Sequence, residues 1–441
     1  MGPHLDRVQS SPALPAQTQV VVIGGGIIGV STALYLAQRG IPVTLLEKGI
    51  IAGEQSSRNW GWCRHTGRDT RELPLIIESM KQWSGMNALT ERDTGFKITG
   101  IAYAAEQEEN LEKWREWAAI AREHGIDSTV IGKQQAEALA PGLQRSLYGA
   151  LYTPVDGRAE PQKAAPAMAE KARELGAVIM QNCAVRQIET TNGTVSGVIT
   201  ENGMISCQAV VIAGGSWSRL ICAGIGTTLP QLKMRSSVLR TTALEAGIDA
   251  AIAFSDFALR KRLDGGYTVA SLAGSIADIV PDSFRFFTKF MPALATEWKT
   301  VRLRLGRRFV EEAFEWKNRP ADQVSIFEKI RILDPKPYEA ANLAVFKALQ
   351  QALPVFKNAQ IAQQWAGLID TTPDIVPVIS PLDQLSGCVV ATGFSGHGFG
   401  IGPGAGMLVA DMVTGEKPVV DPAPFHINRF SDGSKIHIEM W

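Results

Sequence analysis

The chain has 441 residues, of which 45% are hydrophobic and 20% are charged, as in an ordinary soluble globular protein. At about 150 residues per domain, this length indicates two or three domains. The 44 Lys and Arg residues balance the 44 Asp and Glu residues. The excess of positive charge that is typical of nucleic-acid-binding proteins is therefore absent, and we expect no nucleic-acid partner.

The cysteines and histidines argue against a metal centre. The five cysteines lie far apart, none of them forms a C-x-x-C pair, and the six histidines are scattered. Zinc sites and disulfide frameworks need patterned spacing. We therefore expect no metal and a reducing compartment, the cytoplasm.

The N-terminal residues 1–18 contain three prolines and lack the apolar core of a signal peptide. They are predicted to form a flexible leader. Because no window reaches about 18 uninterrupted apolar residues, no transmembrane helix is expected.

Residues 19–48 have the pattern of a strand, a glycine turn, a helix and a second strand. Residues 20–23 are continuously apolar, as in a parallel strand that is buried on both faces. Apolar residues then recur at helical spacing until Gly40, and a second apolar strand at residues 43–46 ends at Glu47.

The turn between the first strand and the helix has the spacing G-x-G-x-x-G, formed by Gly24, Gly26 and Gly29. These glycines allow a tight turn, close approach of the backbone to a pyrophosphate, and close packing of helix on strand. Glu47 follows at the distance expected for an acid that binds ribose hydroxyls. The unit predicts a dinucleotide site, but the motif alone does not separate FAD from NAD.

Helices and strands alternate beyond this unit. An Asn192-Gly193 pair predicts a hairpin turn, and residues 233–354 have weaker periodicity. The predicted helices cover residues 106–124, 160–175 and 404–414, and the predicted strands cover residues 177–188, 194–199, 209–213 and 388–392.

Four segments resemble the family that contains glycine oxidase, sarcosine oxidase and D-amino-acid oxidase. They are GEQSSRNWGWCRHTGRDTRELPL (53–75), AVVIAGGSWSRL (209–220), TTPDIVPVIS (371–380) and ATGFSGHGFGIGPGAG (391–406). Within the family, GEQSSR, AGGSWSRL and the tail DPAPFHINRF (421–430) are most similar to bacterial L-amino-acid deaminases. The chain lacks the N-terminal hydrophobic anchor of those enzymes, which argues against delivery of electrons to a quinone.

The resemblance implies an α/β fold, in which a doubly wound, Rossmann-like FAD domain is joined to a discontinuous, sheet-based α+β substrate domain. We expect residues 19–90, 150–232 and 355–441 in the FAD domain, and residues 91–149 and 233–354 in the substrate domain. FAD is expected to be non-covalent, because Gly367 stands where monomeric sarcosine oxidases carry the cysteine that bonds the flavin. Gly400 stands where they carry a lysine that holds the substrate carboxylate, which argues against sarcosine oxidation.

The resemblance and the motif together give a set of expected cofactor-binding residues. These are Gly24, Gly26, Ile27, Ile28, Gly29, Glu47, Lys48, Ser56, Ser57, Arg58, Trp60, Gly61, Val185, Ala213, Gly214, Trp217, Gly396, His397, Gly398, Phe399 and Gly400.

Two arginines are candidates to bind a substrate carboxylate, a task that suits a planar guanidinium. Arg260 matches the substrate arginine of the deaminases and is expected to be the primary ligand, whereas Arg64 matches the carboxylate-binding arginine of sarcosine oxidases. His397 lies between two glycines and is a candidate to contact substrate or flavin. Trp62 and Phe394 are expected to line the substrate pocket.

The expected reaction is FAD-dependent oxidative deamination, in which the imine product is hydrolysed to a keto acid and ammonia. The alternatives are oxidation of a secondary amine, an opine or a D-amino acid, or a role as the flavin subunit of a heteromeric oxidase complex. The electron acceptor is expected to be dioxygen or a quinone, and a homo-oligomer is left open. Residues 284–305 predict either a helix packed on the substrate domain or an interfacial segment with peripheral contact at the inner membrane.

Overall fold

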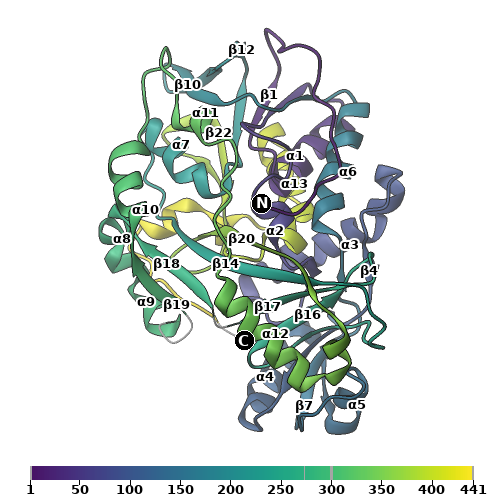
Figure 1. Ribbon diagram of the computed structural model, residues 1–441. Helices are drawn as coiled ribbons and strands as arrows, with labels where there is room; N and C mark the ends of the chain where they lie inside the picture. Colours follow the sequence, from purple (N-terminus) through teal and green to yellow (C-terminus); the bar gives the residue numbers. More distant parts are fainter. Residues whose placement is uncertain (1, 273, 298–300, 440–441) are drawn as a thin grey trace.

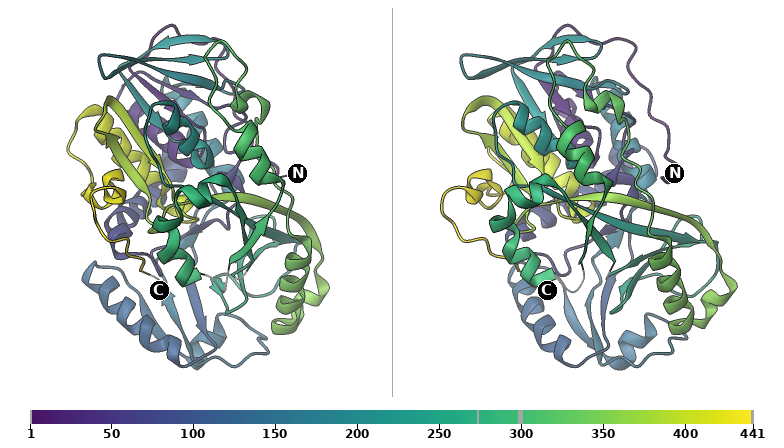
Figure 2. Two further views of the ribbon diagram at one scale, coloured as in Figure 1. Left: turned by 90° about the vertical axis from the view of Figure 1, so that its left-hand side faces the viewer. Right: turned by 60° about the vertical axis from the view of Figure 1, so that its left-hand side comes forward.

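The computed structural model describes residues 2–272, 274–297 and 301–439, which form two halves, each built on a large β-sheet (Figure 1). The halves lie one above the other in the turned views as well (Figure 2). The predicted combination of a doubly wound nucleotide-binding fold with a second sheet is confirmed.

The first sheet has the order β10-β11-β22-β13-β1-β2-β9, with β12 paired to β11 and β21 paired to β22. The strands at its centre are parallel, since β1 pairs with β13 on one side and with β2 on the other. All four residues of β1 are buried. The strands are β1 (Val20–Ile23), β2 (Val43–Leu46), β9 (Val178–Met180), β10 (Val185–Thr191), β11 (Thr194–Thr200), β12 (Gly203–Ser206), β13 (Ala209–Ile212), β21 (Val378–Leu382) and β22 (Leu385–Thr392).

The prediction of one strand over residues 177–188 is wrong. The segment divides into β9, which pairs with β2, and β10, which lies at the opposite edge of the sheet. Residues 181–184 cross between them, where Asn182 adopts φ 50° and its amide donates to the Gly49 carbonyl over 2.8 Å. The hairpin turn at Asn192-Gly193 is confirmed, since both residues have positive φ.

Helices α1, α3, α6 and α13 pack together beside this sheet. α13 begins at Gly398, six residues before its predicted start at residue 404. Its glycines disfavour a helix in isolation, but tertiary packing overrides propensity. A Cβ on Gly406 would lie 2.4 Å from the Ser31 Cβ of α1, and a Cβ on Gly404 would lie 2.7 Å from the Leu75 carbonyl oxygen of α3. Small residues therefore let α13 pack closely between two helices.

The helices have the following bounds. They are α1 (Ile27–Gln38), α2 (Gln55–Arg58), α3 (Leu73–Thr90), α4 (Glu109–Glu123), α5 (Lys133–Ala138), α6 (Pro161–Glu174), α7 (Ser218–Gly224), α8 (Pro281–Arg285), α9 (Phe287–Glu297), α10 (Arg307–Val310), α11 (Ile326–Lys329), α12 (Glu339–Ala352) and α13 (Gly398–Thr414).

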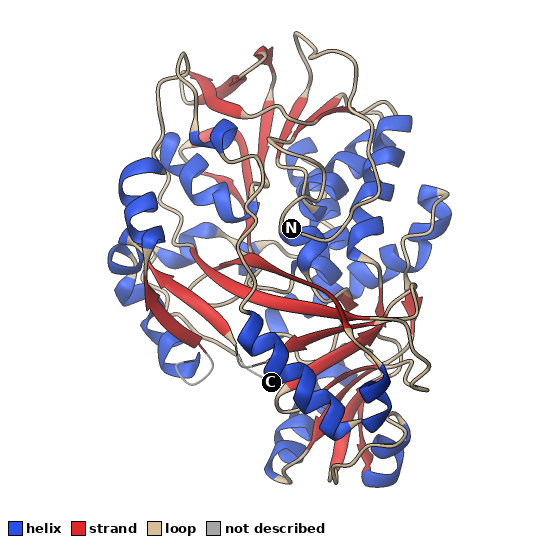
Figure 3. Cartoon of the chain, viewed as in Figure 1, coloured by secondary structure: helices blue, strands red, loops and turns tan. Residues whose placement is uncertain are grey.

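The second sheet has the order β19-β18-β14-β17-β16-β15-β5-β7-β6, and β20 pairs with β14. The long antiparallel strands β14 and β20 cross the middle of the molecule, and α12 packs against the sheet in front of it (Figure 3). The strands are β5 (Ile101–Ala105), β6 (Thr129–Gly132), β7 (Gly149–Thr153), β14 (Leu232–Thr241), β15 (Ala251–Ala253), β16 (Phe257–Lys261), β17 (Tyr267–Ser271), β18 (Ser275–Ile279), β19 (Val301–Leu305) and β20 (Ile361–Thr371). A small separate sheet contains β3 (Trp62–Cys63), β4 (Lys97–Ile98) and β8 (Gly157–Arg158).

The sheets divide the chain differently from the expected domain boundaries. β7 and β20 belong to the second sheet, although both were expected largely or wholly in the FAD domain. Residues 326–331 were expected in the substrate domain but pack on the nucleotide half, where Glu328 pairs with Arg186 over 2.8 Å and Arg331 pairs with Glu201. Sequence periodicity does not reveal such returns of the chain between two sheets.

The N-terminal segment that was expected to be a flexible leader instead packs against the nucleotide half. The amide of Asp6 donates to the Gln162 carbonyl over 3.1 Å, and the amide of Ser11 donates to the Ile179 carbonyl over 2.7 Å. No helix in the described ranges is long and apolar enough to cross a membrane.

The segment 284–305 contains the end of α8, α9 and β19, and residues 298–300 lie outside the described residues. β19 pairs with β18 in the second sheet, while Phe284 and Phe287 are 67% and 54% exposed. The helices lie at the junction of the two halves (Figure 2). The segment thus packs on the substrate half and also exposes apolar rings, so the interfacial alternative stays a prediction.

Gly406→Ala tests the close packing of α1 and α13. The added methyl group should force the helices apart and lower the free energy of unfolding by about 1–3 kcal/mol. Gly85→Ala in α3 is the matched control, because nothing lies within 4 Å of its Cβ position, and it should stabilise the protein by about 0.5–1 kcal/mol. Urea denaturation measures both changes, and equal stability of the two variants would contradict this packing.

Candidate active site

A groove opens at the carboxyl ends of β1, β2 and β13, where the glycine turn lies. Gly24 adopts φ 110°, and a Cβ there would lie 2.4 Å from the Ala213 carbonyl oxygen. A Cβ on Gly29 would lie 2.0 Å from the Gly24 carbonyl oxygen. Both positions therefore require glycine, one for the turn and the other for packing of α1 on the turn.

Glu47 closes one end of this groove beside the glycine turn. Its carboxylate oxygens accept hydrogen bonds from the amides of Gly25 and Gly49, each over 2.7 Å. Burial raises the pKa of Glu47, while neighbouring Lys48 and the two amides oppose this shift. The side chain thus has the position expected of an acid that binds ribose hydroxyls.

The far part of the groove is formed by residues from β20, β22 and the first turn of α13. Asp370 fixes the loop before α13, because its carboxylate accepts from the Gly393 amide over 2.7 Å and from the Thr392 hydroxyl over 3.1 Å. The Gln55 side-chain oxygen is buried without a hydrogen-bond partner in the described part of the chain. A long groove with helix amides and an unused polar atom fits a dinucleotide cofactor.

The structure brings most of the expected cofactor residues to this groove. Those that line it are Gly24, Gly26, Ile27, Ile28, Glu47, Lys48, Ser56, Val185, Ala213, Gly214, Trp217, Gly396, Gly398 and Phe399. Sequence reasoning missed other lining residues, among them Gln55, Ile369 and Asp370, which belong to short or distant elements. Phe394 was expected in the substrate pocket but lines the cofactor groove.

Several expected cofactor residues lie outside the lining. Arg58 is buried in an ion pair with Asp334 over 2.7 Å, and Ser57 donates to the Glu54 carbonyl. Gly61 and Gly400 serve close packing instead, since a Cβ on Gly61 would lie 2.5 Å from the Ala159 carbonyl oxygen and one on Gly400 would lie 3.1 Å from the Trp62 carbonyl oxygen. Trp60 and His397 line a second cavity.

This second cavity has a volume of 970 Å³ and lies where the two halves meet. A row of aromatic rings forms one wall, running from Trp60 through Trp62 and Tyr103 to Trp114 with centroid distances of 5.6, 6.2 and 6.4 Å. Trp62, which was expected to line the substrate pocket, lines this cavity. The cavity can hold a molecule with a large apolar group.

Arg64 presents its guanidinium to this cavity. It donates to the Thr66 carbonyl and lies 6.0 Å from the Tyr103 ring centroid, but it forms no ion pair with a carboxylate in the described part of the chain. Lys233 also lines the cavity, yet it is paired with Glu312 over 3.2 Å. Carboxylates line the cavity as well, among them those of Asp69, Asp278 and Glu439. The buried hydroxyl of Thr371 has no hydrogen-bond partner among the described residues.

Arg260 is placed differently from its expected role as the primary carboxylate ligand. Its side chain is 1% exposed, does not line the cavity, and pairs with Glu160 over 2.8 Å. It also donates to the Trp60 carbonyl over 2.6 Å. Burial alone would raise the pKa of Glu160, but Arg260 holds it below its usual value. The charge of Arg260 is therefore already compensated within the protein.

His397 is the residue before α13, and its ring contributes to the second cavity. Burial lowers its pKa well below the usual value, and the charges of Arg64 and Arg68 act in the same direction. Its Nδ1 atom is buried without a hydrogen-bond partner and lies 3.8 Å from the Glu72 carboxylate. The ring is consequently neutral near pH 7.

The chain resembles known flavoproteins along nearly its whole length. The sequence profile of the family described as "FAD dependent oxidoreductase" matches residues 19–412. The solved structure of L-amino acid deaminase from Proteus myxofaciens in complex with anthranilate is 33% identical, with a TM-score of 0.94, and the match covers 98% of this chain and 97% of that one. The corresponding values for L-amino acid deaminase from Proteus vulgaris are 31%, 0.91, 96% and 99%.

Curated relatives are more distant. Sarcosine oxidase subunit beta of an Arthrobacter species is 25% identical, and the match covers 98% of this chain and 96% of the relative. 4-Methylaminobutanoate oxidase (formaldehyde-forming) of Paenarthrobacter nicotinovorans is 24% identical over 96% of this chain, which spans only 47% of that relative.

In the described part of the chain, no group of acidic, His and Cys side chains could hold a metal ion.

The lowered pKa of His397 predicts how stability depends on pH. As the pH falls through about 6.5, the unfolded chain takes up a proton at this ring and the folded chain does not, so stability is lost. His397→Gln should remove this component, which approaches about 1.4 kcal/mol for each pH unit below 6.5. Urea denaturation at pH 7.5 and 5.5 measures it, and an equal loss of stability in both proteins would contradict a neutral His397.

Proposed function

The chain belongs to the family of FAD-dependent oxidoreductases, and from this premise we propose that it oxidises the C–N bond of an amino acid to an imine. Water then hydrolyses the imine to a keto acid and ammonia. The observation that carries the proposal is Arg64, whose guanidinium faces the second cavity without a carboxylate partner among the described residues.

A partly buried cation without an ion-pair partner favours an anionic ligand, and a guanidinium fork matches a carboxylate in geometry. Arg64 therefore takes over, in this proposal, the role that the sequence assigned to Arg260. Because the cavity reaches Thr371 and His397, next to the strand and the helix that line the cofactor groove, a carboxylate on Arg64 would fix an amino acid close to the cofactor.

FAD, when bound, accepts the hydride equivalent from the substrate. The chain supplies orientation and electrostatics. The residues of the first turn of α13, Gly398 and Phe399, line the cofactor groove, so the positive end of the helix favours negative charge there. Because His397 is neutral, it does not compete with Arg64 for the substrate carboxylate. The ring of Tyr103 in the aromatic wall lies beside Arg64, and such apolar surroundings strengthen the attraction between a guanidinium and a carboxylate.

The size and lining of the cavity favour a large apolar or aromatic side chain on the substrate. Trp60, Trp62, Tyr103 and Trp114 offer rings for stacking. The Proteus myxofaciens deaminase, of the same fold, was solved with anthranilate, an aromatic carboxylate. This likeness supports an amino acid of the same class here.

Oxidation of a secondary amine is the second candidate, since sarcosine oxidase subunit beta is among the relatives. One observation weakens it: a side chain at residue 400, the lysine position of sarcosine oxidases, would meet the Cys63 Cα and the Trp62 carbonyl oxygen, both at 3.1 Å. An anaerobic screen of L- and D-amino acids, sarcosine and opines for flavin bleaching separates the candidates. Reoxidation by dioxygen or by a quinone then identifies the acceptor, and turnover by the isolated chain would exclude dependence on another subunit.

Arg64→Ala should lower kcat/KM for the best amino acid by about 30-fold or more, because loss of a buried charge partner costs about 2–5 kcal/mol. An amine that lacks the carboxylate should react slowly with both proteins and with little difference between them. Arg64→Lys should also be impaired, since an ammonium group cannot form the bidentate contact.

Arg260→Gln is the comparison variant for this experiment. It removes the nearest ion-pair partner of Glu160, which keeps only Arg262 at 3.9 Å, so stability and FAD content should fall, while the preference for a carboxylate in the FAD-loaded protein should persist. If Arg260→Gln instead erased the preference and Arg64→Ala preserved it, the carboxylate ligand would be Arg260.

The bond between protein and FAD is expected to be non-covalent. Residue 367 is a glycine and has no thiol, and the Gln55 side-chain oxygen occupies the space beside it, 1.8 Å from where a Cβ would lie. Acid precipitation should release FAD into the supernatant. Flavin retained in the protein pellet would contradict this expectation.

A further inference from the structure

Arg68 contacts two residues that line the second cavity, Arg64 and His397, and so connects two loops that are distant in sequence. Its side chain is 1% exposed, and each of the three guanidinium nitrogens donates a hydrogen bond. Nε donates to the Arg64 carbonyl over 2.9 Å, and one terminal nitrogen donates to the His397 carbonyl over 3.1 Å. The other terminal nitrogen is paired with Glu72 over 2.8 Å.

Glu72 holds Arg68 in this orientation. It ends a short 3₁₀ helix, η1 (Thr70–Glu72), and is itself 1% exposed. The indole of Trp117 on α4 donates to the Arg68 carbonyl over 3.1 Å, which fixes the backbone as well. The buried charge of Arg68 is thus compensated, and its planar fork has one geometry available.

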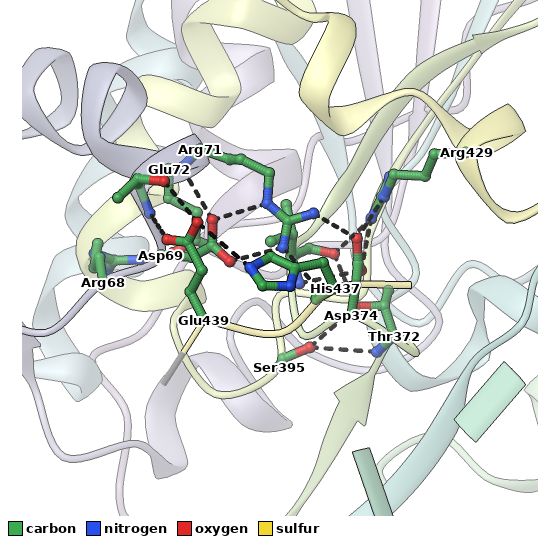
Figure 4. Close-up of polar contacts among 12 residues, drawn as sticks. Arg68, Asp69, Arg71, Glu72, Thr372, Asp374, Ser395, Arg429, His437 and Glu439 are labelled. Atoms are coloured by element: carbon green, nitrogen blue, oxygen red, sulfur yellow. Dashed lines mark hydrogen bonds and ion pairs between the residues drawn. The ribbon is translucent and has the colours of Figure 1, made fainter. Parts of the chain in front are cut away.

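A second ion-pair chain supports the same loop from the other side (Figure 4). Arg71 binds Asp69 over 2.7 Å and Asp374 over 3.2 Å, and Asp374 also binds Arg429. Figure 4 shows Arg68 and Glu72 beside this chain rather than within it. Among the described residues, Arg71 and Arg429 donate to neither the Arg64 nor the His397 carbonyl, whereas Arg68 donates to both.

We propose that Arg68 is a positioning residue that fixes Arg64 relative to His397 and the start of α13. It does not line the second cavity and would act on the substrate only through the two loops that it joins. This inference rests on the proposed function, because it gives Arg64 the substrate carboxylate. The distance from that carboxylate to the cofactor groove would then depend on one buried guanidinium.

Arg68→Lys removes this link with little change in charge or volume. A lysine has a single ammonium group and cannot reach the Arg64 carbonyl, the His397 carbonyl and Glu72 in the same way. At least one buried carbonyl loses its donor, and the loop that carries Arg64 gains freedom. The expected consequence is weaker carboxylate binding and a lower rate of flavin reduction at saturating substrate.

The test uses the full chain loaded with FAD and two readouts. The first is the Kd of benzoate, a carboxylate probe, measured from the change in flavin absorbance. The second is the limiting rate of anaerobic flavin reduction by the best amino acid. Arg68→Lys should raise the Kd and lower the rate by about 10-fold each, with FAD content preserved.

A double-mutant cycle with Arg64→Ala separates positioning from general stabilisation. If Arg68 acts through Arg64, Arg68→Lys should change benzoate binding by less than about 3-fold in the Arg64→Ala background. Arg39→Lys is the matched control, because Arg39 also joins distant elements through an ion pair, to Asp411 of α13, away from both cavities. It should leave both readouts unchanged.

The outcomes distinguish the two proposals. If Arg64→Ala leaves benzoate binding unchanged, the carboxylate assignment falls, and this inference falls with it. If Arg64→Ala weakens binding but Arg68→Lys does not, or if their effects are additive, only the inference is overturned. Should Arg68→Lys fail to fold, Glu72→Gln, which keeps the guanidinium but loosens its anchor, should show smaller changes of the same kind, and their absence would overturn the inference.

Discussion

The close contact of α13 with α1 is the constraint on which the rest of the site depends. It brings a segment near the C-terminus against the first helix of the nucleotide-binding unit, because Gly406 leaves no side chain between it and Ser31. The loop before α13 then lies beside the cofactor groove, and its residues contribute to both cavities. Without this contact, His397 and Arg64 would not be neighbours of the same guanidinium.

The nucleotide-binding unit could be predicted from sequence because its determinants are local. Continuous apolar strands, glycines with fixed spacing and an acid at the end of β2 each follow from the chemistry of one short segment. Glu47 and Gly24 are accordingly found where the motif placed them. The same reasoning failed for residues 177–188, since the crossing at Asn182 depends on contacts with the loop after β2.

The roles of the arginines could not be predicted, because they depend on which carboxylates lie nearby in space. The resemblance favoured Arg260 over Arg64 as the primary carboxylate ligand, but it could not show what lies beside either side chain. Glu160, 100 residues before Arg260, neutralises one of them, and nothing in the spacing of these residues indicates the pair. Arg68 was overlooked for the same reason, since its partners are a carbonyl four residues earlier and another 329 residues later.

The position of strand β20 affects how substrate and product enter and leave the second cavity. It is paired along β14 within the second sheet, yet its last residues line the cofactor groove and its Asp370 carbonyl accepts from the Ser395 amide over 2.9 Å. The β14–β20 ladder lies within the second sheet, so the contacts that cross to the other half are those at the end of β20, where Thr371 also forms a bridge with Phe394. Separation of the two halves would break these contacts. Local movements of the loops at the rim of the cavity would preserve them during exchange of substrate and product.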